Sequence, residues 1–295
     1  MEQIITTTSF GKTKTGEDIS LFRIPNNTND YIELLNYGCT IKGIFLHDRK
    51  GQLRNILCGY ETLAEYEASD LALGAILAGG ACPELCSCTA HKVWEVKEVG
   101  SNYVFLACQV SAEESKAGSA LAVGARVMWV NLNRIVIDIF ITPEHDASVN
   151  FTCNFPFQLS EAAPAASYSL RTFCPEQLLG GEKLPVSQTA YADLAFVPVT
   201  DAPQTFVSGA EDVKPMAELA NSTAGLTISA YSSMDTIQCA SCPAVQGVCL
   251  NQTMGTGVSL KADETLTGRV IYGFDRLYTQ EEMENPAPTP FGAFF

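Results

Sequence analysis

The stretch RIVIDIFI at residues 134–141 decides the fold class of this 295-residue chain. Its isoleucines stand at alternate positions, with Arg, Val, Asp and Phe between them. Successive side chains of a β-strand point to opposite faces, so this alternation predicts a strand with one strongly apolar face. Similar runs predict further strands at residues 19–24, 32–37, 41–46, 103–110, 226–231 and 269–274. Many short strands separated by turn residues are typical of an all-β sandwich or barrel.

Helix signals are few in this sequence. Residues 61–68 predict one helix and residues 278–283 a weaker one, and neither is long enough to organise a core. Residues 285–295 form a proline-rich tail with an apolar end. No stretch has the composition of an interdomain linker, so we expect a single domain over residues 1–295.

The chain is acidic, with 33 Asp and Glu against 18 Lys and Arg and a formal net charge of −15. Such a surface repels a phosphate backbone, so we expect no nucleic-acid partner. The longest apolar stretch, residues 71–82, is too short for a bilayer span of about 20 residues. The N-terminus lacks the basic start and apolar run of a signal peptide. We therefore expect a cytoplasmic protein with no membrane partner, and we expect no cofactor.

Two segments resemble a known family. Residues 149–159 read VNFTCNFPFQL and residues 247–252 read GVCLNQ. They resemble the VNLTNHSYFNL and GFCLET segments of the aldose 1-epimerase (galactose mutarotase) family. Weaker matches follow in the family's order, among them LNYGCTI at residues 35–41, GEKLPV at 181–186 and LKADET at 260–265. The resemblance implies a galactose mutarotase-like antiparallel β supersandwich with a sugar cleft on one concave face.

The resemblance also places the catalytic positions of the family. The family's catalytic His falls on Asn154, its catalytic Glu on Asn251 and a sugar-binding Arg on Gly79. Mutarotation needs one group to protonate the ring oxygen and another to remove the proton of the anomeric hydroxyl. A carboxamide forms hydrogen bonds but does not titrate near neutral pH. The resemblance therefore implies the frame of a mutarotase without its acid–base pair.

Other candidate site residues follow from the same resemblance. Gln238 matches a cleft residue of the family, and Asp201 is a weak counterpart of its substrate-binding Asp. Glu84 and His91 lie in a shortened loop, where Glu84 could act as a base and His91 could overhang the cleft, or each could be a solvated surface side chain. We expect His47, in a turn-like stretch, to be a solvated surface side chain.

Eleven cysteines are many for a cytoplasmic chain, and an odd number cannot all pair internally. Five of them lie in segments that the resemblance places near the cleft, namely Cys82, Cys86, Cys88, Cys239 and Cys242. They could form a thiolate metal site with His91, act in redox chemistry, or pack as small side chains in a closed cleft. The spacing CPELCSC at residues 82–88 is not a usual zinc spacing, which favours packing.

Taken together, these features predict a galactose mutarotase-like protein of carbohydrate metabolism that is catalytically inactive. It would act as a carbohydrate-binding, regulatory or scaffold protein, with a sugar, a sugar phosphate or another protein as partner. The alternative is an active aldose 1-epimerase whose acid and base have moved to other positions.

Overall fold

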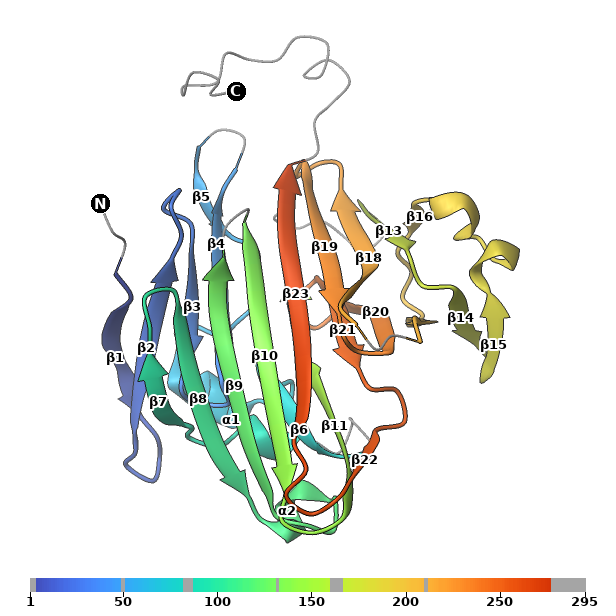
Figure 1. Cartoon of the computed structure of the whole chain (residues 1–295). Helices are drawn as coiled ribbons and strands as arrows, with labels where there is room; N and C mark the ends of the chain where they lie inside the picture. Colours follow the sequence, from blue (N-terminus) through green and yellow to red (C-terminus); the bar gives the residue numbers. More distant parts are fainter. Residues whose placement is uncertain are drawn as a thin grey trace.

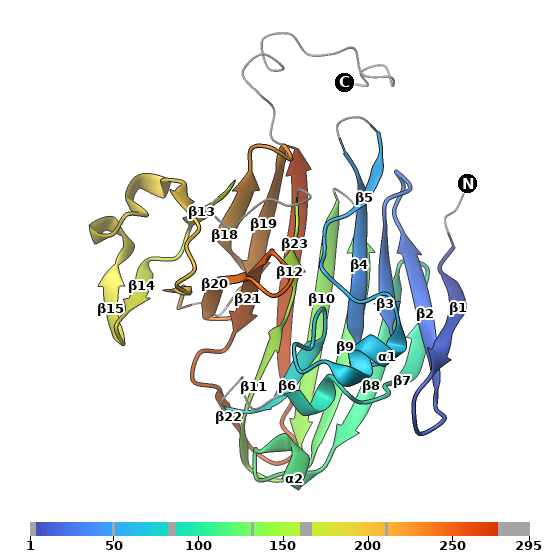
Figure 2. The ribbon, with the colours of Figure 1, turned by 180° about the vertical axis from the view of Figure 1, so that it is seen from behind.

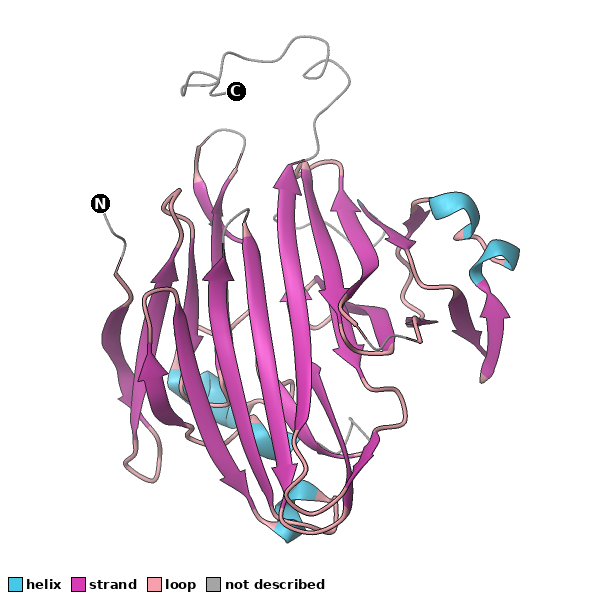
Figure 3. Cartoon of the chain, in the orientation of Figure 1, coloured by secondary structure: helices cyan, strands magenta, loops and turns pink. Residues whose placement is uncertain are grey.

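The computed structural model describes residues 4–48, 51–81, 87–130, 133–159, 167–209 and 212–276. Antiparallel strands make up most of this part of the chain, and helices are few and short (Figure 3). The all-β prediction is confirmed. The predictions for residues 278–283 and 285–295, and for Cys82, Glu84 and Cys86, lie outside the described residues.

The first sheet contains five antiparallel strands that follow one another in sequence order. They are β1 (Thr6–Lys12), β2 (Asp18–Pro25), β3 (Tyr31–Leu35), β4 (Thr40–His47) and β5 (Leu53–Asn55). Three of the predicted stretches fall on β2, β3 and β4.

The second sheet contains nine strands, and its long members run side by side across the front of the molecule (Figure 1). In spatial order they are β16 (Val197–Pro198), β13 (Tyr168–Thr172), β18 (Lys214–Asn221), β19 (Leu226–Ser232), β23 (Leu266–Arg276), β10 (Arg134–Pro143), β9 (Leu121–Val130), β8 (Tyr103–Val110) and β7 (Glu95–Val99). The alternating stretch is β10, between β23 and β9, and its four alternate isoleucines are fully buried. Its apolar face therefore belongs to the core, as the alternation predicts.

The third sheet also contains nine strands and comes to the near side when the molecule is turned (Figure 2). Its path runs through β15 (Glu182–Pro185), β14 (Glu176–Leu179), β17 (Gln204–Val207), β20 (Thr236–Cys242), β21 (Gly247–Thr253), β11 (Ala147–Cys153) and β22 (Val258–Leu260). In addition, β12 (Pro156–Phe157) pairs with β21, and β6 (Ile76–Gly80) pairs with β11. The segment that carries the family resemblance is thus divided into β11 and β12 just before Pro156. This is expected, because proline has no backbone N–H to donate to a neighbouring strand.

The second and third sheets enclose the main core. The Phe155 and Phe157 rings lie 5.6 and 5.3 Å from the Tyr272 ring of β23, measured between ring centroids. The Tyr272 hydroxyl donates a 2.7 Å hydrogen bond to the Leu250 carbonyl of β21. Phe151 of β11 packs so closely on Gly268 of β23 that a Cβ at Gly268 would meet its ring. Odd-numbered residues of β11 therefore face the core, and even-numbered ones face away from it.

Helices connect strands and do not build the core. Helix α1 (Leu63–Ala68) lies within the predicted stretch 61–68 and begins with a capping box between Thr62 and Glu65. The other short helices are α2 (Ala112–Ser115), η2 (Ser87–Thr89), η4 (Val186–Gln188) and η5 (Ala192–Leu194). In the part of the chain that the structure describes, none of them has the length and apolar character that crossing a membrane would require.

Candidate functional site

A pocket of about 680 Å³ opens on the face of the third sheet that points away from the core. Seven strands of this sheet, the turn before β20 and the turn after β21 contribute to it. Its described lining residues are Leu77, Thr152, Leu178, Lys183, Thr205, Val207, Asp235, Thr236, Gln238, Asn251, Thr253, Gly255 and Thr256. Hydroxyls and carboxamides dominate the list, with a few aliphatic side chains among them. This composition suits a neutral, hydroxylated ligand.

Two polar atoms in this lining are buried and have no hydrogen-bond partner in the described part of the chain. They are Oγ1 of Thr152 on β11 and Oδ1 of Asn251 on β21. Buried polar atoms are nearly always paired in native proteins, because an unpaired one costs about 1–3 kcal/mol. An unpaired hydroxyl and an unpaired carbonyl thus lie in the same pocket.

Asn154 and Asn251 lie opposite each other across the third sheet. Thr152 pairs with Thr253, and Pro156 pairs with Cys249. Moving two residues along from the first pair toward the second places residue 154 opposite residue 251. The two positions that the resemblance assigns to an acid and a base are therefore neighbours in space, and both hold carboxamides.

The two carboxamides differ in their surroundings. Asn154 Nδ2 donates to the carbonyl oxygens of Leu71 and Ala72 at 2.6 and 3.3 Å, and its Oδ1 accepts from the Cys249 thiol at 3.9 Å. Its side chain is thus occupied by the protein, and it is not among the residues that line the pocket. Asn251 lines the pocket with its carbonyl oxygen unpaired. Of the two carboxamides, only Asn251 is among the described residues that line the pocket.

Gln238 is the second residue named from the sequence that lines the pocket. It pairs with Asn251 across β20 and β21, so the two side chains share one face of the sheet. Its Nε2 donates to Thr205 Oγ1 at 3.3 Å. The structure thus brings together Gln238 and Asn251, two of the residues that the resemblance named.

Two titratable side chains occur among the described lining residues. Lys183 lies 3.6 Å from the Glu176 carboxylate, and Asp235 accepts a 2.9 Å hydrogen bond from the Thr236 hydroxyl. Neither was among the candidate site residues from the sequence, although Lys183 lies within the GEKLPV match; Asp235 lies in the turn before β20. Both are outside the positions that the resemblance assigns to catalysis.

The remaining candidates lie elsewhere. His91 Nδ1 is 3.3 Å from the Tyr37 hydroxyl, and His91 lines a different pocket together with Glu17 and Lys92. Asp201 is exposed and accepts a 3.2 Å hydrogen bond from Ser241 Oγ. The structure therefore does not bring His91 or Asp201 to the pocket described above.

The described cysteines do not form a common site with His91. Cys88 donates to the Ala78 carbonyl at 3.7 Å, and burial raises the pKa of its thiol. Cys239 points into the core, where burial raises its pKa to about 12. Cys242 lies half-buried at the end of β20. Within the described ranges no group of three or more His, Cys, Asp or Glu side chains could hold a metal ion.

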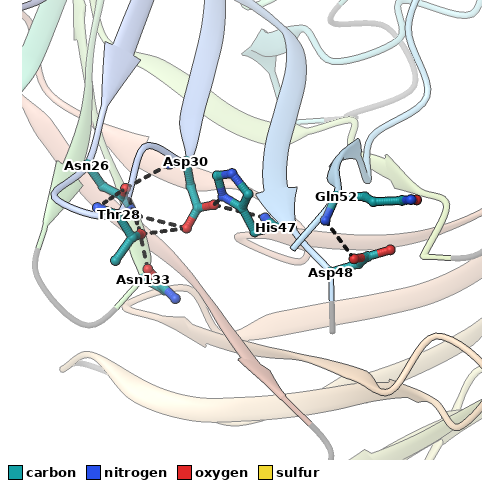
Figure 4. A network of polar contacts seen from close by, with 7 residues as sticks. All are labelled: Asn26, Thr28, Asp30, His47, Asp48, Gln52 and Asn133. Atoms are coloured by element: carbon teal, nitrogen blue, oxygen red, sulfur yellow. Dashed lines mark hydrogen bonds and ion pairs between the residues drawn. The ribbon is translucent and has the colours of Figure 1, made fainter. Parts of the chain in front are cut away.

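His47 is more constrained than the sequence suggested (Figure 4). Its Nδ1 lies 2.6 Å from Oδ1 of the buried Asp30, which also accepts the His47 backbone N–H at 2.9 Å. The other oxygen, Oδ2, accepts from Thr28 Oγ1 at 2.7 Å and from Asn26 Nδ2 at 3.2 Å. His47 is thus a partly exposed surface side chain, as expected, but the β3–β4 hairpin also brings a carboxylate onto its ring.

Comparison with solved structures identifies the architecture. No protein-family model matches the sequence, and neither does any curated protein. A GalM/aldose epimerase homologue from C. elegans superposes with a TM-score of 0.78 at 13% identity, covering 88% of this chain and 99% of that one. This chain has the galactose mutarotase-like fold.

Further galactose mutarotase-like structures agree. Galactose 1-epimerase from Lactobacillus acidophilus gives a TM-score of 0.76 at 12% identity and covers 93% of this chain and 99% of that chain. A galactose mutarotase-like protein from Clostridium acetobutylicum gives 0.68 at 8% identity, with 92% and 99% covered. The supersandwich expected from the sequence is confirmed. At such identities the likeness establishes the fold alone.

Proposed function

We propose that this galactose mutarotase-like protein binds a carbohydrate in the pocket of the third sheet and does not catalyse mutarotation. The observation that carries the proposal is the pair of unpartnered polar atoms, Thr152 Oγ1 and Asn251 Oδ1, in a pocket rich in hydroxyls and carboxamides. Sugar hydroxyls donate and accept hydrogen bonds, so one ligand can satisfy both atoms.

The absence of catalysis follows from the opposed carboxamides. Neither Asn154 nor Asn251 can take up or release a proton near neutral pH. General acid–base catalysis is worth about 10²–10⁴-fold in rate, and that contribution requires groups that titrate. Asn154 is moreover held by two backbone carbonyls, so its side chain supports the loop before β6.

Binding is tested by calorimetry with glucose, galactose and their 6-phosphates. We expect at least one of these sugars to bind the wild-type chain, and Asn251→Leu and Gln238→Ala to weaken binding at least tenfold. Gln109→Ala is the matched control, because Gln109 is an exposed carboxamide on β8 of the second sheet. Failure of all the sugars to bind would remove the carbohydrate proposal and leave the scaffold role.

Catalysis is tested by polarimetry on α-glucose and α-galactose. We expect the wild-type chain to leave the rate of anomer interconversion at its buffer value. Acceleration that Asp235→Asn or Lys183→Met abolishes would contradict the proposal. It would show that the acid and the base have moved within the pocket, as in the active-epimerase alternative.

A further inference from the structure

Three thiols meet where β20 and β21 join. Cys242 is the last residue of β20 and pairs with Gly247, the first residue of β21. Cys58 Sγ donates to the Val245 carbonyl of the intervening turn at 3.4 Å. A Cβ at Gly247 would lie 3.2 Å from Cys58 Sγ, so Cys58 occupies the space beside the glycine. Cys249 completes the cluster on the same face, two residues beyond Gly247.

Cys242 and Cys249 are diagonal neighbours on this hairpin. Ala240 pairs with Cys249 and Cys242 with Gly247, so the two cysteines share a face and are offset by two residues. Diagonal neighbours of an antiparallel pair have Cα atoms about 7–8 Å apart, and a disulfide requires about 4.4–6.8 Å. A modest closure of the hairpin end would bring the two sulfurs into bonding distance.

The members of the cluster differ in exposure. Cys58 and Cys249 are buried, whereas Cys242 is half-buried and open to small reagents. Hydrogen bonds from the Cys249 thiol and from the Val245 backbone N–H favour the thiolate of Cys242 and hold its pKa below the ordinary value. The same pairing raises the pKa of Cys249, and burial raises that of Cys58 to about 11. Cys242, the most accessible of the three cysteines, is therefore also the one that favours the nucleophilic thiolate.

We propose that Cys242 is a site of thiol oxidation by hydrogen peroxide and that Cys249 is its resolving partner. The Cys242 sulfur attacks one peroxide oxygen, the O–O bond breaks, and the departing hydroxide takes a proton to become water. The Cys249 thiol then loses its proton and attacks the sulfur of the resulting sulfenic acid, which releases a second water as the disulfide forms. One peroxide is reduced and two thiols are oxidised, so two electrons are transferred in all.

This inference does not require a sugar ligand, although the reaction would reach the pocket. Cys249 Sγ also lies 3.9 Å from Asn154 Oδ1, and Cys249 stands two residues before Asn251 on the same face of β21. Forming the disulfide would move the Cys249 sulfur away from Asn154. The oxidised chain is therefore expected to differ from the reduced one beside the pocket.

The test uses the full-length chain treated with hydrogen peroxide, followed by alkylation of the remaining thiols and non-reducing peptide mass mapping. We expect a peptide linked through Cys242 and Cys249. In Cys249→Ser we expect a sulfenic acid at Cys242 that dimedone traps. Cys174→Ser is the matched control, because Cys174 is a buried cysteine elsewhere in the fold, and it should leave the cross-link unchanged.

A second measurement needs no variant. At pH 7 we expect iodoacetamide to modify Cys242 of the wild-type chain at least tenfold faster than Cys174. Its rate should reach half-maximum below the pH of about 8.5 that is typical of a free thiol. Equal reactivity of Cys242 and Cys174 would overturn the proposal, and a cross-link from Cys242 to Cys58 would overturn the role of Cys249.

Discussion

Asp138 on the second sheet and the pocket on the third sheet differ in how their buried polar atoms are paired. On β10 of the second sheet, Asp138 is 2% exposed and accepts from Arg269 Nε at 2.6 Å, Arg269 Nη2 at 3.0 Å and Arg126 Nη2 at 2.7 Å. On the third sheet, Thr152 Oγ1 and Asn251 Oδ1 are buried without any partner in the described chain.

The pKa of Asp138 reflects its pairing. Burial alone would raise the pKa of this carboxyl, but hydrogen bonds from Arg269 and Arg126 outweigh burial and hold the pKa below the ordinary value. The carboxylate therefore stabilises the fold. Each unpaired buried atom of the pocket should instead lower the stability of the fold.

Removing the paired carboxylate should have the largest effect. We expect Asp138→Ala to reduce the free energy of unfolding by about 2 kcal/mol, less than for a fully buried pair because both arginines are partly exposed. Denaturant unfolding measures the change, and the exposed Asp212→Ala provides the control. Sugar binding should persist in Asp138→Ala, and a loss of both stability and binding would show that the two regions are coupled.

Removing an unpaired hydroxyl should change the free energy of unfolding by a smaller amount and in the opposite direction. We expect Thr152→Val, which keeps the shape of the side chain, to raise the free energy of unfolding by about 1 kcal/mol and to weaken sugar binding. Thr142→Val is the matched control, because the Thr142 hydroxyl is 2.7 Å from the Thr265 hydroxyl and should give no gain. A loss of stability in Thr152→Val would indicate that its hydroxyl already has a partner.

Lowering the pH should gradually reduce the contribution of Asp138 to the free energy of unfolding. A group whose pKa is lower in the folded state stabilises the fold above its unfolded pKa, about 3.9 for Asp, and this contribution is lost as pH falls through the folded pKa. We therefore expect the stability difference between the wild-type chain and Asp138→Asn to shrink from pH 6 to pH 3. A difference that stays constant over that range would argue against an ionised Asp138.

Local patterns in the sequence predicted the strands well. The alternation at residues 134–141 identified β10, and α1 lies within the predicted helical stretch 61–68. These features depend on neighbours within one element, which the sequence displays directly. Cys153 likewise faces the core while Thr152 lines the pocket, as a period of two requires.

The site could be predicted only in part, because it depends on register between distant strands. Gln238 and Asn251 were found through the family resemblance, whereas Lys183 and Thr205 come from strands whose pairing no local pattern reveals, and Asp235 comes from the turn before β20. The register of the β3–β4 hairpin also explains why the His47 ring contacts Asp30. Tyr31 pairs with Phe45, so the preceding Asp30 reaches the end of β4, and an acidic residue just before β3 was the available signal.

The hydrogen bonds of the Asn150 side chain on β11 should affect the rate at which a ligand binds in the pocket. Its Oδ1 accepts from Phe151 N, Thr253 Oγ1 and Met254 N, and its Nδ2 donates to the carbonyl oxygens of Ala81 and Gly255. These hydrogen bonds hold the rim of the pocket in place in the ligand-free chain. Little conformational entropy is then lost on association, so a ligand should enter a preorganised rim without waiting for a loop to close.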